Sequence, residues 1–351
     1  MIRAFRLRLV APVFLLLVIP AQGLGQLATK GGPEVAPLQL CLARAADYSP
    51  VYPTQTFPAG ATNEVTAVLR LDKGESYTTM TATWIAVDVG DVSPPNTVIH
   101  EILMQVKGKD RAAARWFIRE GVLPEGKYRL DVAADGKHWR SVEFAIAVMP
   151  PAAEVKEPKD LLPLTEGTVW RYGFEQEFAP GLKFDLPPGL KLDADGKLRA
   201  TVTYTVAKKD SVGTHIEIRR NNELVMEEWW RLTEAGLAMV QIKQGNEVVK
   251  FDPPHAVWPW PLEAPREWVY EPEDKSFKQT YRMWGPVPVK GPTGEALGYV
   301  VLTEQPSPSI IMTVERHYLP GVGLVREVII QAHALRGVML SRQEYVLREK
   351  P

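Results

Sequence analysis

The chain has 351 residues, 45% of them apolar, and a formal net charge of −1 at neutral pH. This length suffices for about two domains, each with a core of its own. The near-neutral charge offers no basic field to DNA or RNA, so a nucleic acid is not expected as a partner.

The first 25 residues predict a signal peptide. Arg3, Arg6 and Arg8 precede the apolar run "LVAPVFLLLVI", which is shorter than the ~20 residues that span a membrane comfortably. Small residues in "PAQGLGQ" then fit a cleavage site. The alternative is an uncleaved membrane anchor. We expect an exported protein, in the periplasm or at the cell surface or outside the cell, with no membrane span beyond the leader and an oligomeric state left open.

Residues 36–149 predict an antiparallel β-sandwich. Seven or so short β-rich runs, among them "EVTAVLRL" and "TTMTATWIAVDV", are separated by turn signals. The segment "LPEGKYRLDVAADGKHWRSVEFAI" resembles the last hairpin of many extracellular immunoglobulin-like domains. The Cys…Trp…Cys core of antibody domains is absent, so the resemblance implies the architecture alone. Cys41, the single cysteine, excludes an internal disulfide and is expected as a buried thiol in a strand.

Residues 150–160 predict a semi-stiff linker, because "MPPAAEVKEPKD" is rich in proline and charge. Residues 161–351 predict a second β-rich domain with longer strands, such as "TVWRYGFEQEF" and "SIIMTVERHYL". Asn221-Asn222, Gly245-Asn246 and Asp195-Gly196 separate these runs as hairpin turns do. The fold class is therefore all-β.

Two glycines, Gly321 and Gly323, could begin a phosphate-binding loop. That reading requires a third glycine, where the chain has Arg326, and a helix, where it has the β-branched, alternating "LVREVII". Pro320 and Gly321 instead suit the two central positions of a type II turn. The segment is therefore predicted to be a hairpin.

"YLPGVGLVRE", residues 318–327, and "PLTEGTVWRY", residues 163–172, resemble the closing and opening motifs of a group of uncharacterised bacterial secreted proteins. The resemblance implies a strongly curved antiparallel sheet or half-barrel, similar to envelope lipoprotein carriers. It implies no catalytic residues. A Pro- and Trp-rich insertion at 252–292 does not fit the pattern.

Motifs of catalysis and metal binding are weak. The sequence holds no G-x-S-x-G, H-E-x-x-H or C-x-x-C. His215 with Glu217, and Glu315 with His317, would converge on a metal only if their strands were neighbours. Alternating polar residues on a half-solvated sheet are the commoner reason for such pairs. "LDADGK", residues 192–197, is expected to be a turn rather than a calcium loop, and no metal or cofactor is expected.

Tryptophans are the most distinctive feature, and "PPHAVWPWPLEAPREWVY" is the densest part. Its prolines oppose regular sheet pairing, so 252–292 is predicted to be a long irregular loop. The candidate ligand contacts are Trp258, Trp260, Trp268, Trp229 and Tyr270. The alternative is that these rings fold inward and plug one end of the sheet.

These patterns favour a non-enzymatic exported protein of the cell envelope, which binds an apolar ligand or a partner segment on its curved sheet. The expected partner is a lipid, a glycan or a protein segment. One alternative is a secreted hydrolase of glycans or peptides, whose acid would be Glu227, Glu228, Glu263 or Glu267. Another is a structural cell-surface component without a small ligand.

Overall fold

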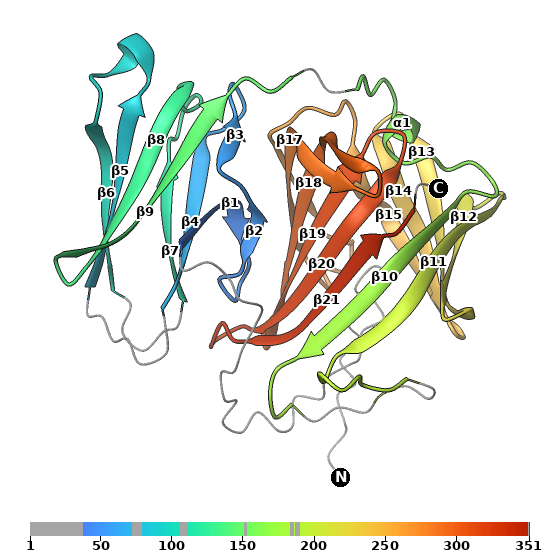
Figure 1. Ribbon diagram of the computed structural model, residues 1–351. Coiled ribbons are helices and arrows are strands. Elements are labelled where there is room, and N and C mark those ends of the chain that lie inside the picture. Colours follow the sequence, from blue (N-terminus) through green and yellow to red (C-terminus); the bar gives the residue numbers. More distant parts are fainter. Residues whose placement is uncertain are drawn as a thin grey trace.

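A computed structural model describes residues 38–71, 79–105, 111–150, 153–182, 186, 190–349 and 351 (Figure 1). The predicted signal peptide, residues 1–25, lies outside the described residues. The described chain is nearly all β, as the sequence predicts. Two smaller sheets form a sandwich, and twelve strands form one strongly curved sheet beside it.

The sandwich holds the first nine strands. One sheet has the order β2-β1-β4-β7, and the other has the order β3-β9-β8-β5-β6. A short 3-10 helix, η1 (Gly90–Val92), follows β5. The strands are β1 (Leu38–Arg44), β2 (Pro50–Pro53), β3 (Thr56–Pro58), β4 (Glu64–Arg70), β5 (Thr79–Asp88), β6 (Thr97–Gln105), β7 (Arg111–Phe117), β8 (Gly126–Ala134) and β9 (Lys137–Ala147).

Aromatic rings fill the space between the two sheets of the sandwich. Trp84 on β5 is fully buried, and its ring centroid lies 6.0 Å from that of Trp116 on the facing sheet. Phe144 packs edge-on against Trp84 and stacks on Tyr128. Cys41 on β1 is buried and free, as predicted, and burial raises the pKa of its thiol far above the ordinary value.

The curved sheet holds the other twelve strands, and every neighbouring pair is antiparallel. Its order is β15-β14-β13-β12-β11-β10-β21-β20-β19-β18-β17-β16. The strands are β10 (Val169–Phe178), β11 (Leu198–Lys209), β12 (Thr214–Arg220), β13 (Glu223–Thr233), β14 (Gly236–Gln244), β15 (Glu247–Pro259), β16 (Arg266–Tyr270), β17 (Gln279–Gly291), β18 (Gly294–Pro306), β19 (Ile310–Leu319), β20 (Gly323–His333) and β21 (Met339–Leu347).

The two end strands of this sheet, β15 and β16, lie against each other without a backbone ladder. The Tyr270 hydroxyl donates to the Pro253 carbonyl at 3.0 Å, and Trp268 Nε1 donates to the Ala256 carbonyl at 3.4 Å. His255 and Tyr270 also stack with ring centroids 4.2 Å apart. Side chains therefore bring the sheet close to full closure.

The prediction of an irregular loop at 252–292 is wrong, because most of this segment belongs to β15, β16 and β17. Prolines are accommodated where the strand registers shift. Pro253 and Pro254 lie between the pairs Met239↔His255 and Gln241↔Lys250, and Pro286 lies in the shift after Trp284. A ladder hydrogen bond is not required at such irregularities, so proline is tolerated there.

The end of the predicted linker is part of the curved-sheet body rather than a spacer. Helix α1 (Pro158–Leu161) lies over one end of the curved sheet (Figure 1), with Leu161 and Leu162 buried. The Glu157 and Asp160 side chains form a capping box, and the Asp160 carbonyl accepts a hydrogen bond from the Gly321 amide at 2.6 Å. This helix closes space that the sheet alone leaves open.

The glycine pair lies in a β19–β20 hairpin, as the sequence predicts. Gly321 has φ +71°, and the Val322 amide donates to the Leu319 carbonyl at 3.1 Å, as a type II turn requires. A Cβ on Gly323 would lie 2.8 Å from Leu162 Cδ1. The opening and closing motifs meet here, since Trp170 Nε1 donates to the Val322 carbonyl at 2.7 Å.

The sandwich docks on the outer face of the curved sheet through β1, β2 and their connection. An apolar cluster there comprises Ala43, Ala45, Val51, Leu302, Val328 and Ile330. Beside it, the Tyr52 amide donates to Glu315 Oε1 at 3.2 Å, and the Tyr52 hydroxyl donates to the Pro288 carbonyl. Within the part of the chain that the structure describes, none of the helices has the length and apolarity to cross a membrane.

Candidate functional site

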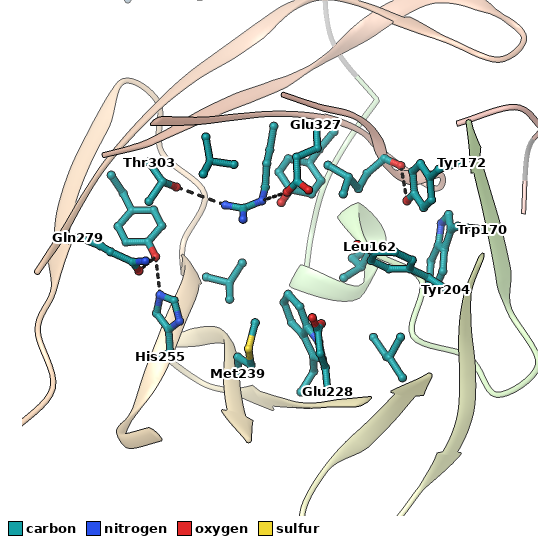
Figure 2. A pocket seen from close by; sticks show the side chains of 18 of the residues that line it. Leu162, Trp170, Tyr172, Tyr204, Glu228, Met239, His255, Gln279, Thr303 and Glu327 are labelled. Carbon is teal, nitrogen blue, oxygen red and sulfur yellow. Dashed lines mark hydrogen bonds and ion pairs between the residues drawn. The ribbon is translucent and has the colours of Figure 1, made fainter. Parts of the chain in front are cut away.

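An internal cavity lies on the concave side of the curved sheet, with an unfilled volume of about 780 Å³ including its mouth (Figure 2). Most of its lining is aromatic or aliphatic. The aromatic residues are Trp170, Tyr172, Tyr204, Trp230, Tyr281 and Tyr318; the other apolar residues are Leu162, Ile216, Met239, Val257, Met312, Val314 and Leu324; the polar residues are Glu228, His255, Gln279, Thr303, Arg316 and Glu327. This composition, mainly apolar with a few convergent polar groups, is that of a small-molecule site.

Strand alternation explains why these residues face inward. On β19, Met312, Val314, Arg316 and Tyr318 are two residues apart and all line the cavity. The residues between them face the opposite side, where Glu315 meets the sandwich. One strand therefore contributes to the cavity with one face and to the interface between sandwich and curved sheet with the other.

A buried ion pair stands on one wall of the cavity. Arg316 Nε lies 2.6 Å from Glu327 Oε2, and Arg316 Nη1 donates to Thr303 Oγ1 at 3.3 Å. Burial acts to lower the pKa of Arg316, but the Glu327 carboxylate outweighs it and the pKa is raised. The guanidinium is therefore charged, and its charge is matched by a carboxylate.

Glu228 projects into the cavity from β13, facing Glu327 across it (Figure 2). Its side chain is 1% exposed, and its Oε2 accepts a hydrogen bond from Trp230 Nε1 at 2.8 Å. Its Oε1 has no hydrogen-bond partner among the described residues. Burial raises the pKa of Glu228 to about 8, so this carboxyl is largely protonated at neutral pH.

A chain of polar side chains ends at His255 on β15. Gln279 Nε2 donates to Gln305 Oε1 at 2.7 Å, and the Tyr281 hydroxyl donates to Gln279 Oε1 at 2.5 Å. His255 Nε2 contacts the Tyr281 hydroxyl in turn. Burial lowers the pKa of His255 to about 3, so the ring is neutral. Its Nδ1 has no partner within the described part of the chain.

A second, smaller cavity of about 340 Å³ lies farther along the interior of the sheet. Tyr204 lines both cavities. The remaining lining is Phe174, Val202, Ile218, Arg220, Val225, Met226 and Tyr345. The second cavity is therefore partly polar, with a guanidinium in its wall.

The five residues predicted to contact a ligand do not line either cavity. Trp258 is 2% exposed and packs edge-on against Tyr318, while Trp268 stacks on Tyr281 at 5.0 Å. Tyr270 bonds to β15 at the seam between the sheet ends. Trp229 stacks on His215, and its Nε1 donates a hydrogen bond to Asp210. Trp260, which follows the end of β15, is half-buried. Trp258 and Trp268 thus support lining residues from behind.

Some of the lining residues that the prediction missed are direct sequence neighbours of those it named. Trp230 follows Trp229, and Val257 precedes Trp258. Counting alternate positions along "MEEWW" groups Met226, Glu228 and Trp230 on one face. That signal was in the sequence. The partnership of Arg316 with Glu327 had no comparable signal, because it depends on how β19 pairs with β20.

The four acidic residues considered for a hydrolase lie in different parts of the structure. Glu228 alone lies in the cavity, whereas Glu227 faces outward and contacts His215 and Lys243. A hydrogen bond from Lys243 lowers the pKa of Glu227 from its ordinary value despite partial burial. Glu263 and Glu267 are exposed. The four acids therefore do not form one catalytic site.

The two histidine–glutamate pairs do not meet either. His215 lies on β12 and His317 on β19, strands that are not neighbours in the sheet. Across the described residues, no group of three or more His, Cys, Asp and Glu side chains is placed to hold a metal.

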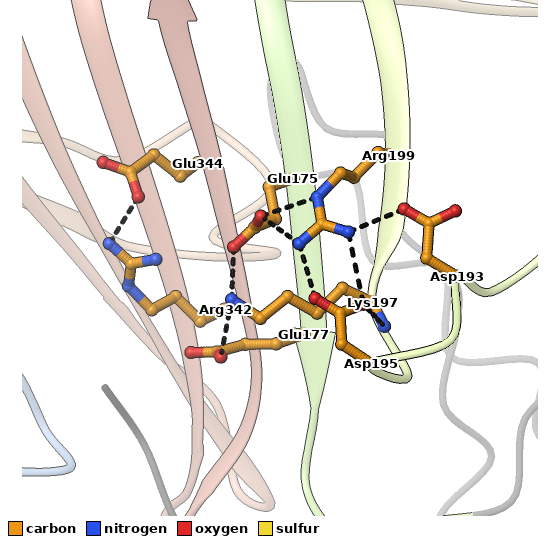
Figure 3. A network of polar contacts seen from close by, with 8 residues as sticks. All are labelled: Glu175, Glu177, Asp193, Asp195, Lys197, Arg199, Arg342 and Glu344. Carbon is orange, nitrogen blue, oxygen red and sulfur yellow. Dashed lines mark hydrogen bonds and ion pairs between the residues drawn. The ribbon is translucent and has the colours of Figure 1, made fainter. Parts of the chain in front are cut away.

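Residues 192–197 form a turn, as predicted, with the Gly196 amide donating to the Asp193 carbonyl at 2.9 Å. Arg199 Nη1 lies 2.7 Å from Asp193 and its Nη2 lies 2.6 Å from Asp195 (Figure 3). Lys197 pairs with Glu175 in the same network. The aspartates are thus engaged by a guanidinium, an arrangement that suits a surface turn.

Comparisons with known proteins leave the function open. No protein-family profile and no curated protein sequence matches the chain. Among solved structures, it is similar to a candidate exported protein with a YmcC-like fold from Bacteroides fragilis (12% identity, TM-score 0.27, 53% of this chain and 96% of that one). It is also similar to a candidate lipoprotein from Parabacteroides distasonis (17% identity, TM-score 0.23, 54% and 96%). At these TM-scores neither likeness assigns a fold family or a function to this chain.

Proposed function

We propose that this protein is an exported, non-enzymatic binding protein that holds an apolar ligand inside its curved sheet. The observation that carries the proposal is the internal cavity of about 780 Å³, lined mainly by aromatic and aliphatic side chains. Interiors of β-proteins normally close on themselves at high density. An apolar interior space that stays open to a mouth, with a few polar side chains converging on it, is the usual form of a ligand site.

A hydrolase is less well supported by the same residues. Glycoside hydrolysis needs a protonated acid and a second, free carboxylate beside it. Glu228 suits the first role, but Glu327 is held 2.6 Å from Arg316 and is not free to act as a base or nucleophile. The cavity is therefore better suited to holding a molecule than to reacting with it.

We infer that the sandwich is an immunoglobulin-like docking module. The orders β1-β4-β7 and β6-β5-β8-β9 match strands A-B-E and C′-C-F-G of such domains. Tyr128, near the start of β8, donates its hydroxyl to the Pro124 carbonyl at 2.6 Å, as in a tyrosine corner. Trp84 occupies the place of the buried strand-C tryptophan.

Export rests on residues 1–25 and is tested by cell fractionation. The full chain is expected outside the cytoplasm, and a chain starting at residue 26 is expected to stay inside. Retention of the full chain in the cytoplasm would refute export while leaving the cavity proposal intact.

Binding is tested with the apolar fluorophore 1-N-phenylnaphthylamine and residues 26–351. We expect saturable fluorescence enhancement by the wild type, weakened at least tenfold by Ile216→Trp, because the larger ring fills the cavity. Glu217→Trp is the matched control, since Glu217 is the next residue on β12 and faces the other way. Met312→Phe, a smaller change, serves if Ile216→Trp misfolds. Absence of probe binding by the wild type, or equal binding by the filled variants, would refute the proposal.

A further inference from the structure

Two buried polar atoms in the apolar lining lack partners among the described residues, Glu228 Oε1 and His255 Nδ1. Their side chains are 1% and 2% exposed, and both line the cavity of about 780 Å³. A buried polar group without a hydrogen bond costs about 1–3 kcal/mol of stability. Nine such atoms occur among the described residues, and these two are the ones whose residues line the cavity, where a polar group of a ligand would satisfy them.

Glu228 presents a donor to the cavity. The carboxyl is deeply buried, has no cation within hydrogen-bond distance and faces a second carboxylate, Glu327, so the neutral form is favoured. Because Oε2 accepts from Trp230 Nε1, the proton resides on Oε1. This O–H then faces the cavity with no acceptor.

His255 presents an acceptor. The Tyr281 hydroxyl has one proton and donates it to Gln279 Oε1, whose amide nitrogen donates onward to Gln305. The contact between His255 and Tyr281 must therefore use a proton on His255 Nε2. In a neutral imidazole this leaves a lone pair on Nδ1, which has no hydrogen-bond donor among the described residues.

The cavity has no unmatched positive charge for an anionic head group. Its one guanidinium, Arg316, lies 2.6 Å from Glu327 and has Thr303 as a further partner. A carboxylate or phosphate placed here would be buried near two carboxyl groups without a cation of its own. The charge balance around Glu228 and His255 therefore favours a neutral ligand group there, whereas the second cavity has a buried guanidinium, Arg220, in its lining.

The strand register places the donor and the acceptor on the same wall. Trp230 pairs with Met239, and Met239 pairs with His255, so these three form a row across β13, β14 and β15. Glu228 is two residues from Trp230 on β13, which places its Cα about 12 Å from that of His255. Both residues line the cavity from these positions, so one polar group of a ligand between them can contact both.

We propose that the cavity takes an apolar chain bearing a neutral hydrogen-bonding group, an amide or a hydroxyl, which Glu228 and His255 bind, and that it disfavours carboxylate and phosphate head groups. This deepens the proposed function and rests on it. The Glu228 O–H donates a hydrogen bond to the oxygen of the ligand group, and His255 Nδ1 accepts a hydrogen bond from that group's own N–H or O–H.

Matched dodecyl compounds test this by displacing 1-N-phenylnaphthylamine from residues 26–351 at pH 7. Dodecanamide and dodecan-1-ol are expected to displace the probe at concentrations at least tenfold lower than dodecanoate and dodecyl phosphate. Glu228→Leu is expected to reduce that preference below about threefold while the probe itself still binds. Glu228→Gln is the control that keeps a neutral donor of the same shape and is expected to retain the preference.

The failures of the two proposals are distinguishable. If the probe and every dodecyl compound fail to bind, the proposed function is wrong. If the probe binds but the four compounds are equal, or dodecanoate is preferred, only the neutral-group inference is wrong. A loss of preference in Glu228→Gln would also overturn it, because a charged carboxylate would then be required. Should Glu228→Leu fail to fold, His255→Leu is expected to show the same loss of preference.

Discussion

In both the sandwich and the curved sheet, alternate residues of each strand face the interior, but side chains fill the interior only in the sandwich. In the sandwich two sheets face each other, and the rings of Trp84, Trp116 and Phe144 meet between them. In the curved sheet twelve strands enclose a wider space, and the inward side chains leave a cavity of about 780 Å³. The number of strands around the interior decides whether side chains alone can fill it.

The chemistry of the two interiors differs as well. The ring cluster of the sandwich is apolar, whereas the interior of the curved sheet contains the buried residues Glu327, Glu228 and His255 and the largely buried Arg316. Buried charges seldom add stability in comparison with apolar residues of the same shape. The sandwich interior is therefore arranged for stability, and the curved-sheet interior retains the polar groups that we propose to bind a ligand.

The largest effect that would sharpen this comparison is expected from Trp84→Ala. Because Trp84 is fully buried in a filled core, the change should cost about 3–5 kcal/mol in the free energy of unfolding of the sandwich. Trp230→Ala should cost less than half as much in the curved sheet, since one face of that ring already borders the cavity. Urea denaturation measures both. Equal losses would mean that the cavity is not a packing gap.

The ion pair inside the curved sheet gives the next largest effect. Glu327→Leu removes the carboxylate of Arg316 and should destabilise the protein by about 3 kcal/mol. The double variant Arg316→Met with Glu327→Leu should recover most of that loss, because no charge is then left buried. Urea denaturation of the single and double variants checks this. Additive losses would contradict the view that the pair matters through charge rather than packing.

The fold class was predictable from the sequence because strand periodicity and turn chemistry are local. Asp135-Gly136 and Asn221-Asn222 have positive φ, as their hairpins require, and Gly321 forms the expected turn. The wrong prediction of a loop at 252–292 also has a physical reason. Proline excludes a ladder bond at its own position, but a register shift removes that need, and register depends on the neighbouring strand.

The site was predictable in kind but not in its members. An aromatic-rich interior follows from the tryptophan content, yet the choice between Trp229 and Trp230 depends on which face of β13 turns inward. Glu228 could be placed with Trp230 by alternation alone. The pairing of Arg316 with Glu327, and the polar chain ending at His255, join strands through contacts that no sequence spacing encodes.

The pH dependence of stability distinguishes the two interiors through Glu228. Its pKa is raised to about 8 in the fold from about 4.5 when unfolded, so the stability that its protonated form contributes is full below pH 4.5 and is lost as pH rises towards 8. His255, with a pKa lowered to about 3, acts in the opposite sense and only below about pH 6.5.

We therefore expect the free energy of unfolding to fall by about 1–2 kcal/mol between pH 6.5 and 8. The charged groups facing Glu228 are Glu327 and Arg316, and burial also raises the pKa of Glu327 from its ordinary value. Glu228→Gln should flatten most of the fall in urea denaturations at matched pH values. An unchanged slope in Glu228→Gln would show that another group causes the fall.

The smallest effect concerns the contact that joins the two regions. Glu315 is buried there; burial acts to raise its pKa, but His317 at 2.5 Å and Arg326 at 3.3 Å hold the pKa below its ordinary value. Tyr52 adds its amide to Glu315 and its hydroxyl to the Pro288 carbonyl. Tyr52→Phe removes the hydroxyl alone and should cost about 1 kcal/mol.

Because that bond joins the sandwich to β17, its loss should separate the two regions rather than weaken either interior. Differential scanning calorimetry is expected to show one unfolding transition in the wild type and a broader or divided one in Tyr52→Phe. Tyr128→Phe, which loses a hydroxyl bond inside the sandwich, is the matched control and should lower the transition without dividing it. If Tyr52→Phe also lowers a single transition without dividing it, the remaining contacts between the sandwich and the curved sheet keep the two regions coupled, and the Tyr52 hydroxyl is not what joins their unfolding.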